Sequence, residues 1–195
     1  DKLFFLPENQ EESLPGLSPV LETESVVVKE DGSVLLPILV TPELSGSSVT
    51  ITVSGIAPGW DVSGPGSYDP ATGTWTITVT GSYDGGPILA PPADSDVDLT
   101  GLVVTVTETN AQTGQSGETG VPVNVVVDAV ADAPNLSTEN AKGPEDTDLP
   151  VIIETSVKDS DGSEEITAIY IRNVPDGFVL SSGVDEGGGV WKLSP

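Results

Sequence analysis

The 195-residue chain contains no cysteine, no histidine and no methionine, and only six lysine and arginine residues. Without cysteine it can form neither a disulfide nor a thiolate nucleophile, and without histidine it has no imidazole base. The same absences exclude zinc sites built from Cys and His ligands. The lack of cysteine does not exclude export; it means that the fold is held together by something other than disulfides.

Positive charge is scarce while negative charge is abundant, since 31 Asp and Glu residues give a formal net charge of −25. Nucleic-acid binding is excluded, because it needs Lys and Arg to displace counterions from phosphate, and attraction to anionic membrane surfaces is disfavoured. No apolar run reaches the roughly 18 residues of a membrane-spanning segment. A folded chain of this charge repels itself unless the charge is spread over a solvated surface or neutralised by bound cations.

Short runs of alternating apolar and polar residues dominate the rest of the sequence. Examples are VTITVS (Val49–Ser54), WTITVT (Trp75–Thr80), GLVVTVT (Gly101–Thr107) and VPVNVVVD (Val121–Asp128). A period of two places the apolar residues of each run on one face of a strand, and Gly, Pro, Asp and Ser in the gaps indicate turns. The pattern predicts an all-β fold of tandem antiparallel β-sandwich modules, Ig-like or cadherin-like.

The chain repeats itself with a domain-sized period. Glu30 and Glu145 are 115 residues apart, and Trp75 and Trp191 are 116 apart. A period of this size indicates tandem domains rather than a solenoid, and the recurring Trp favours a core position over sugar stacking.

The repeat sets the expected domain boundaries. We expect residues 21–133 to form a first β-sandwich module and residues 134–195 to form the N-terminal half of a second, incomplete module. Residues 1–20 are either an acidic leader or the tail of a preceding repeat; both interpretations fit the sequence.

Acidic residues crowd around the boundary between the two copies, in the linker VVVDAVADAP (Val125–Pro134), in GPED (Gly143–Asp146) and in DSDGSE (Asp159–Glu164). We expect the linker, the first turn and the loop after the first hairpin of a sandwich to gather at one end, where these carboxylates converge. The candidate metal ligands are Asp128, Asp132, Glu145, Asp146, Asp159, Asp161 and Glu164.

Calcium is the cation that such a cluster favours. Ca²⁺ takes 6–8 oxygen ligands, whereas Mg²⁺ keeps much of its water, and Gly162 beside the Asp-x-Asp pair lets the backbone bend. The EF-hand pattern is not met, because the Gly falls at position four from Asp159 rather than at six. The alternative is a solvated turn, since Asp, Ser and Gly are ordinary turn residues.

The first copy departs from the second at this point. PELSGSSV (Pro42–Val49) stands where the second copy has KDSDGSEEI, so no full calcium site is expected at the N-terminal tip of the first module. A further acidic run, DSDVD (Asp94–Asp98), is either a solvated loop or an ion site that relieves the repulsion between its carboxylates.

The motifs of the boundary resemble the cadherin-like or Ig-like tandem repeats of bacterial RTX-type surface adhesins. The resemblance is carried by DAVADAP (Asp128–Pro134), Glu145-Asp146-Thr147, DSDGSE, VPDGF (Val174–Phe178) and GVWKL (Gly189–Leu193), and it is looser over residues 21–127. It implies calcium at module junctions in a secreted stalk on the bacterial cell surface, acting in adhesion and biofilm formation. It matches Asp128 and Asp132 to linker acids, and Glu145, Asp146, Asp159 and Asp161 to the acids of the following module.

We therefore expect a calcium-rigidified extender segment whose partners are neighbouring modules of the same chain. The alternative is a ligand-binding module of the same adhesin class that recognises a sugar or peptide of a host or bacterial surface. An enzyme is not expected, because nothing in the sequence places two carboxylates across a cleft.

Overall fold

The computed structural model describes residues 16–158 and 162–195, and every regular element in them is a β-strand. The predicted all-β fold is confirmed. Contacts divide the chain into two compact units, with the main division between Val126 and Val127. The described residues of unit 1 are 16–28, 32–91 and 97–126; those of unit 2 are 29–31, 92–96, 127–158 and 162–195.

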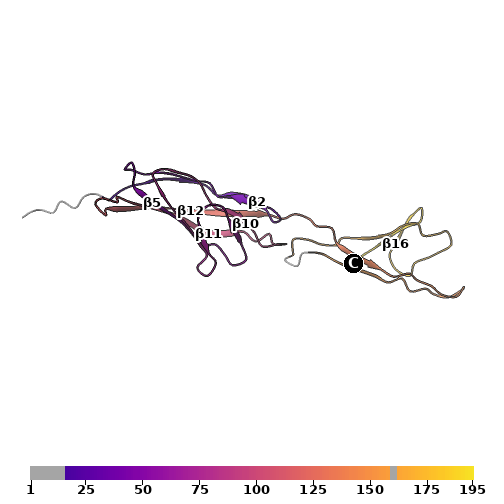
Figure 1. Cartoon of the computed structure of the whole chain (residues 1–195). Helices are drawn as coiled ribbons and strands as arrows, with labels where there is room; N and C mark the ends of the chain where they lie inside the picture. The colour runs from indigo at the N-terminus through magenta and orange to yellow at the C-terminus, as the bar shows by residue number, and fades with distance from the viewer. Residues whose placement is uncertain (1–15, 159–161) are drawn as a thin grey trace, which may run out of the picture. The chain divides into compact units, whose positions relative to one another are not determined.

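The largest sheet contains six strands in the order β2-β12-β11-β5-β8-β7 (Figure 1). The long strands β11 and β12 pair antiparallel, and β11 pairs antiparallel with β5 on its other side. The strands are β2 (Val26–Lys29), β5 (Ser48–Ser54), β7 (Ser67–Asp69), β8 (Thr74–Thr80), β11 (Leu99–Thr109) and β12 (Ser116–Asp128).

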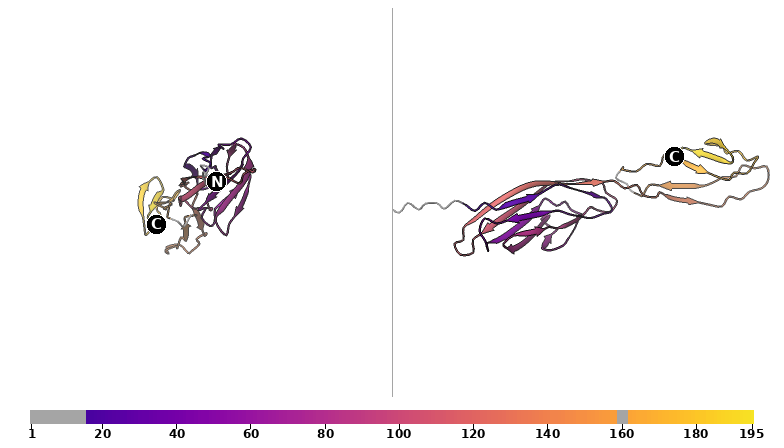
Figure 2. Two further views of the ribbon diagram at one scale, coloured as in Figure 1. Left: turned by 90° about the vertical axis from the view of Figure 1, so that its left-hand side faces the viewer. Right: turned by 90° about the horizontal axis from the view of Figure 1, so that it is seen from above.

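Two sheets of three strands complete unit 1, one in the order β1-β4-β9 and one in the order β3-β10-β6 (Figure 2). The pairs within them are antiparallel. The strands are β1 (Val20–Thr23), β3 (Val34–Leu35), β4 (Ile38–Thr41), β6 (Asp61–Ser63), β9 (Tyr83–Gly85) and β10 (Ile88–Ala90).

The core of unit 1 is built by alternate residues of these strands, as the period of two predicts. Every second residue of β5 is fully buried and the residues between are partly exposed. Trp75 on β8 is 1% exposed, and its indole N–H donates to the carbonyl of Pro65 at 2.9 Å, which confirms its core position. The fully buried residues include Ile38, Val40, Val49, Ile51, Val53, Leu89, Leu102, Val104 and Val106.

The first hairpin of unit 2 repeats that of unit 1 in register. Strand β13 (Asn135–Thr138) pairs with β14 (Ile153–Ser156), and Asn135 stands opposite Ser156. In β1 and β4 the pair at the same place is Val20 and Thr41, each 115 residues earlier in the chain. The two hairpins therefore share one register, at the 115-residue spacing found in the sequence.

The second sheet of unit 2 repeats part of the six-stranded sheet. It comprises β15 (Ile169–Ile171), β16 (Val184–Gly187) and β17 (Val190–Leu193) in the order β15-β17-β16, matching β5-β8-β7. Ile171 stands opposite Trp191 as Val53 stands opposite Trp75. Trp191 is 9% exposed and takes the core position of Trp75.

Within the part of the chain that the structure describes, unit 2 has no counterparts of β11 and β12. Strand β15 therefore has no neighbour on the edge where β5 pairs with β11. A hollow of about 630 Å³ in unit 2 is lined by Leu149, Ile169 and Val179 and also by polar residues such as Asp148 and Ser181. Val179 is 82% exposed.

The connection between β4 and β5 is held by a buried carboxylate. Glu108 on β11 is fully buried, and its two oxygens accept the N–H groups of Glu43 at 2.8 Å and Leu44 at 2.9 Å. Burial alone raises the pKa of this carboxyl, but the hydrogen bonds outweigh burial and hold the pKa of Glu108 below its ordinary value. The connection occupies the place of DSDGSE in the second copy, and here backbone donors satisfy the acid.

Gly73 offers a test of the packing between two loops. Its φ is +62°, and a Cβ atom there would lie 2.2 Å from the carbonyl oxygen of Ile56, whose N–H donates to Gly73. Gly81 has a similar φ of +82° but open space around it. We expect Gly81→Ala to cost about 1–2 kcal/mol for its left-handed backbone. Gly73→Ala should cost clearly more, because the Ile56 loop must also move, and equal losses in urea unfolding would contradict this.

Glu108 gives unit 1 a specific acid sensitivity. Because its folded pKa is lowered, its contribution is complete above the ordinary carboxyl value near ~4.3 and is lost as pH falls through the folded value. We expect Glu108→Gln to lower the free energy of unfolding at neutral pH by about 2–3 kcal/mol, since hydrogen bonds to a charged acceptor are strengthened. Urea unfolding as a function of pH should show a shallower acid loss in the variant, and parallel curves would refute the assignment.

Candidate functional site

The candidate site lies in unit 2, at the end of the β13–β14 hairpin where β13 begins and β14 ends. Asp132 precedes β13 in the linker, and Lys158 follows β14. The register pairs Asn135 with Ser156 at this end, so the linker and the loop after β14 start side by side. Asp159 and Asp161, two of the predicted ligands, lie outside the described residues.

Two predicted ligands, Asp132 and Glu164, meet at this end. A carboxylate oxygen of Glu164 accepts the backbone N–H of Asp132, and both residues are partly buried. The loop after β14 thus returns to the linker and fixes its backbone. This hydrogen bond uses only the backbone N–H of Asp132.

Glu30 reaches the same linker and was not among the predicted ligands. It is 2% exposed, and one of its carboxylate oxygens accepts the backbone N–H of Val130. Its own N–H donates to the carbonyl oxygen of Asp128 at 3.1 Å. Asp128, a predicted ligand, contributes this carbonyl to the contact while its side chain is exposed.

The second carboxylate oxygen of Glu30 has no hydrogen-bond partner in the described part of the chain. It is buried, and no described residue donates a hydrogen bond to it. The other buried polar atoms without a described partner are hydroxyl oxygens, of Thr23, Ser47 and Tyr83. A buried carboxylate oxygen without a donor is costly and calls for an explanation such as a bound ion or water.

Lys158 bridges two carboxylates at the linker end of the hairpin. Its ammonium group donates to the Oδ2 atom of Asp132 and lies 3.4 Å from the Oδ1 atom of Asp94. The hydrogen bond to Asp132, followed by that to Asp94, raises the pKa of Lys158 above its ordinary value. Asp94 belongs to the DSDVD run, whose role the sequence left open, and its φ of +56° is left-handed.

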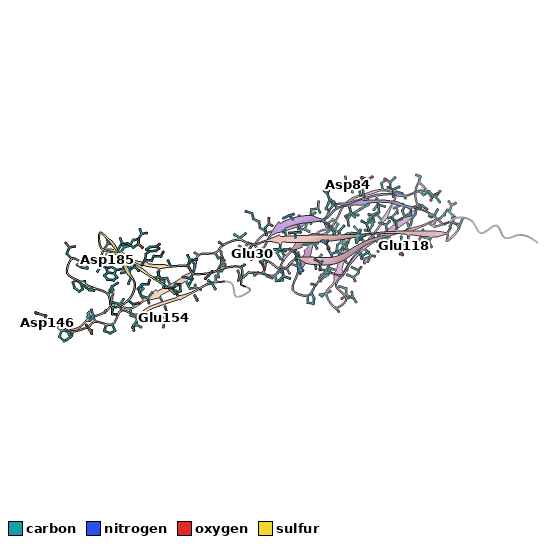
Figure 3. The ribbon with its side chains drawn as sticks, turned by 180° about the vertical axis from the view of Figure 1, so that it is seen from behind. Glu30, Asp84, Glu118, Asp146, Glu154 and Asp185 are labelled. Atoms are coloured by element: carbon teal, nitrogen blue, oxygen red, sulfur yellow. The ribbon has the colours of Figure 1, made fainter. Side chains whose placement is uncertain are left out.

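Glu145 and Asp146 lie elsewhere in unit 2. They are exposed residues of the connection between Thr138 and Ile153, at the opposite end of the β13–β14 hairpin from Asp132. Figure 3 shows Asp146 and Glu30 at opposite ends of the unit. The expectation that Glu145 and Asp146 lie beside the linker is therefore wrong. The two strands of the first hairpin run along the module, so the turn that joins them lies at the end away from the linker.

The repeat explains why Glu30 takes the place expected for Glu145. The two residues are 115 positions apart and lie in equivalent connections, between β1 and β4 and between β13 and β14. Glu30 contacts the linker that leaves its module. Glu145 therefore corresponds to the linker-contacting position of the first module, and its spacing of 115 residues from Glu30 is the sequence signal for both.

Among the residues that the structure describes, no three acidic side chains lie close enough together to hold a metal ion. Asp159 and Asp161 are outside that set. The structure brings Asp132, Glu164, Glu30, Asp94 and the Asp128 carbonyl to the linker segment, and calcium binding there stays a prediction.

Unit 1 has hollows that bear on the ligand-binding alternative. One of about 360 Å³ is lined by Glu22, Glu24 and Asp84, and one of about 280 Å³ lies between the β4–β5 connection and residues 110–112. Recognition of a sugar or peptide at either stays a prediction.

Comparison with known proteins identifies no family for this chain. No family model and no curated protein matches the chain. Among solved structures it is similar to the titin domains Z1Z2 in complex with telethonin, at 13% identity and a TM-score of 0.34, covering 90% of this chain and 79% of that chain. It is also similar to a chimeric titin Z1Z2 functionalised with an exogenous peptide from decorin, at 15% identity and a TM-score of 0.31, covering 92% and 82%. Likenesses this weak carry no functional argument.

The described part of the chain contains no helix that is long and apolar enough to span a membrane.

Proposed function

We propose that this chain is a calcium-rigidified extender segment of a bacterial cell-surface adhesin. The observation that carries the proposal is the Glu30 carboxylate, buried against the linker with one oxygen lacking a described donor. In a chain of net charge −25, a cation is the partner that this oxygen most needs.

The residues around the linker suit a hard cation that prefers oxygen. Glu30 offers a free carboxylate oxygen, and Asp132 a side chain that carries negative charge into the same segment. Asp159 and Asp161 complete the proposed ligand set. Ca²⁺ supplies the positive charge and takes 6–8 such oxygens, whereas Mg²⁺ keeps much of its water.

The mechanical role follows from where these residues stand in the chain. Glu30 directly follows β2, and Asp128 ends β12. Asp132 is part of the linker itself, and Glu164 holds the N–H of Asp132 from the loop after β14. With these carboxylates drawn to one cation, the linker backbone loses its freedom to rotate, and a string of modules becomes a stiff stalk.

The adhesin assignment rests on the resemblance of the boundary motifs and on the register-matched repeat. The partners proposed are the neighbouring modules, and the location is the bacterial surface, in adhesion and biofilm formation. Glu145 is the equivalent of Glu30 in the second copy.

Thermal unfolding in a CaCl₂ titration tests the proposal. Binding to the folded state adds RT ln(1 + [Ca²⁺]/Kd), which is about 2.7 kcal/mol at a hundredfold excess over Kd. We expect the Tm to rise with Ca²⁺, to return with EDTA, and to change little with Mg²⁺. A Tm that ignores millimolar Ca²⁺ would leave DSDGSE as a solvated turn and reject the proposal.

Glu30→Gln identifies the carboxylate responsible, with Glu24→Gln, an exposed acid of unit 1, as the matched control. Without Ca²⁺, we expect Glu30→Gln to be as stable as the wild type or more stable, because a buried charge without a partner is removed. With Ca²⁺, it should lose most of the rise in Tm that Glu24→Gln retains. An undiminished calcium response in Glu30→Gln would exclude Glu30 as a ligand.

A further inference from the structure

Among the described residues at the linker end of the β13–β14 hairpin, Lys158 is the basic residue that forms ion pairs with carboxylates. Its ammonium group contacts Asp132 and Asp94, which come from the linker and from the DSDVD run. Among the described contacts of unit 2, no other basic residue bridges two carboxylates. Lys142, for example, is exposed in the connection at the far end of the hairpin. A positive charge thus already occupies the point where Asp94 and Asp132 face each other.

We propose that the Lys158 ammonium and a divalent cation are alternative occupants of the Asp94–Asp132 pair, so that Lys158 sets the calcium affinity of the linker site. This rests on the proposed function, and it adds Asp94 as a ligand that the sequence left open. Lys158 holds the linker in the calcium-free chain and leaves when the cation binds.

The two occupants exclude each other for reasons of charge and space. An ammonium group hydrogen-bonded to a carboxylate takes the position from which an ion bound to the same oxygens would coordinate. Two cations that close together also repel each other. One of the two must leave, and the divalent ion, with more charge and more ligands, displaces the ammonium.

The structure shows that Lys158 can leave at little cost. Its side chain is 50% exposed, and those of Asp94 and Asp132 are 38% and 25% exposed. Ion pairs with this much solvent around them are weak, and a freed lysine is solvated at once. Lys158 is not among the described partners of Glu30, whose buried Oε2 atom has no described hydrogen-bond donor, so the ammonium does not satisfy that oxygen.

Asp94 has an unusual backbone conformation for a residue other than glycine. Its φ of +56° lies in the left-handed region, which costs a non-glycine residue energy unless a contact repays it. Asn adopts this conformation as readily as Asp, so Asp94→Asn removes the charge and keeps the turn.

The test compares calcium binding by the full chain carrying Lys158→Gln with the wild type and with Lys142→Gln, which removes the same charge far from the linker. Isothermal titration calorimetry at constant ionic strength gives the affinity, and thermal unfolding in EDTA gives the calcium-free stability. The apparent Kd for Ca²⁺ equals the intrinsic Kd divided by the fraction of chains whose site is vacant. Lys158→Gln leaves the site vacant in every chain, so we expect the variant to bind Ca²⁺ roughly threefold to thirtyfold more tightly. Lys142→Gln should stay within about twofold of the wild type.

The calcium-free state separates competition from simple support of the fold. We expect Lys158→Gln to have a lower Tm than the wild type in EDTA, and an equal or higher Tm at saturating Ca²⁺. Asp94→Asn should weaken calcium binding. A merely structural lysine would lower the Tm under both conditions and leave the affinity unchanged or weaker.

Each outcome decides between the two proposals. A wild type that binds Ca²⁺ while Lys158→Gln binds with equal or lower affinity overturns the competition and leaves the extender function standing. A wild type that binds no Ca²⁺ overturns both. Tighter binding in Lys158→Gln but not in Lys142→Gln establishes the competition.

Discussion

A buried carboxylate oxygen without a donor is the constraint around which the linker segment is organised. Glu30 is almost fully buried, and Val130 satisfies only one of its two oxygens. The chain has few basic residues with which to neutralise acids, and it places Lys158 at the neighbouring Asp94–Asp132 pair rather than at Glu30. We propose that a cation from outside the chain is the partner of the remaining oxygen, and the proposed calcium site and the proposed role of Lys158 both follow from that.

Glu108 shows the alternative solution to the same problem. It is fully buried too, but each of its oxygens accepts a backbone N–H of the β4–β5 connection, and its pKa is lowered as a result. The equivalent connection of the second copy carries DSDGSE. The two modules thus share strand register but differ in how their loops manage negative charge: with backbone donors in one, and with a proposed cation in the other.

The sequence predicts the strands and their repeat well, because alternation and the spacing between copies depend on local pattern. Val49, Ile51 and Val53 alternate as expected, and Trp75 and Trp191 share a core position. Local sequence pattern does not determine at which end of a module a loop lies. It depends on how many residues the first hairpin spans, so the sequence placed Glu145 and Asp146 at the linker and missed Glu30.

Asp94 and Lys158 could not be assigned from sequence for a related reason. Their contact joins a loop before β11 to a loop after β14, and only the folded chain brings them together. The DSDVD run left two interpretations open, and a single lysine beside acids forms no recognisable motif. Asp132 and Glu164, by contrast, were expected to meet, and the structure joins them through the Asp132 N–H.

The central claim is that calcium stiffens the linker, and an inter-module distance distribution tests it most directly. The chain has no cysteine, so Ser67→Cys and Ser181→Cys place one nitroxide on each unit at exposed positions. Pulsed electron–electron double resonance then compares the widths of the distance distribution in Ca²⁺ and in EDTA. The account predicts a narrow distribution with Ca²⁺ that broadens in EDTA, and a width that does not depend on Ca²⁺ would contradict it.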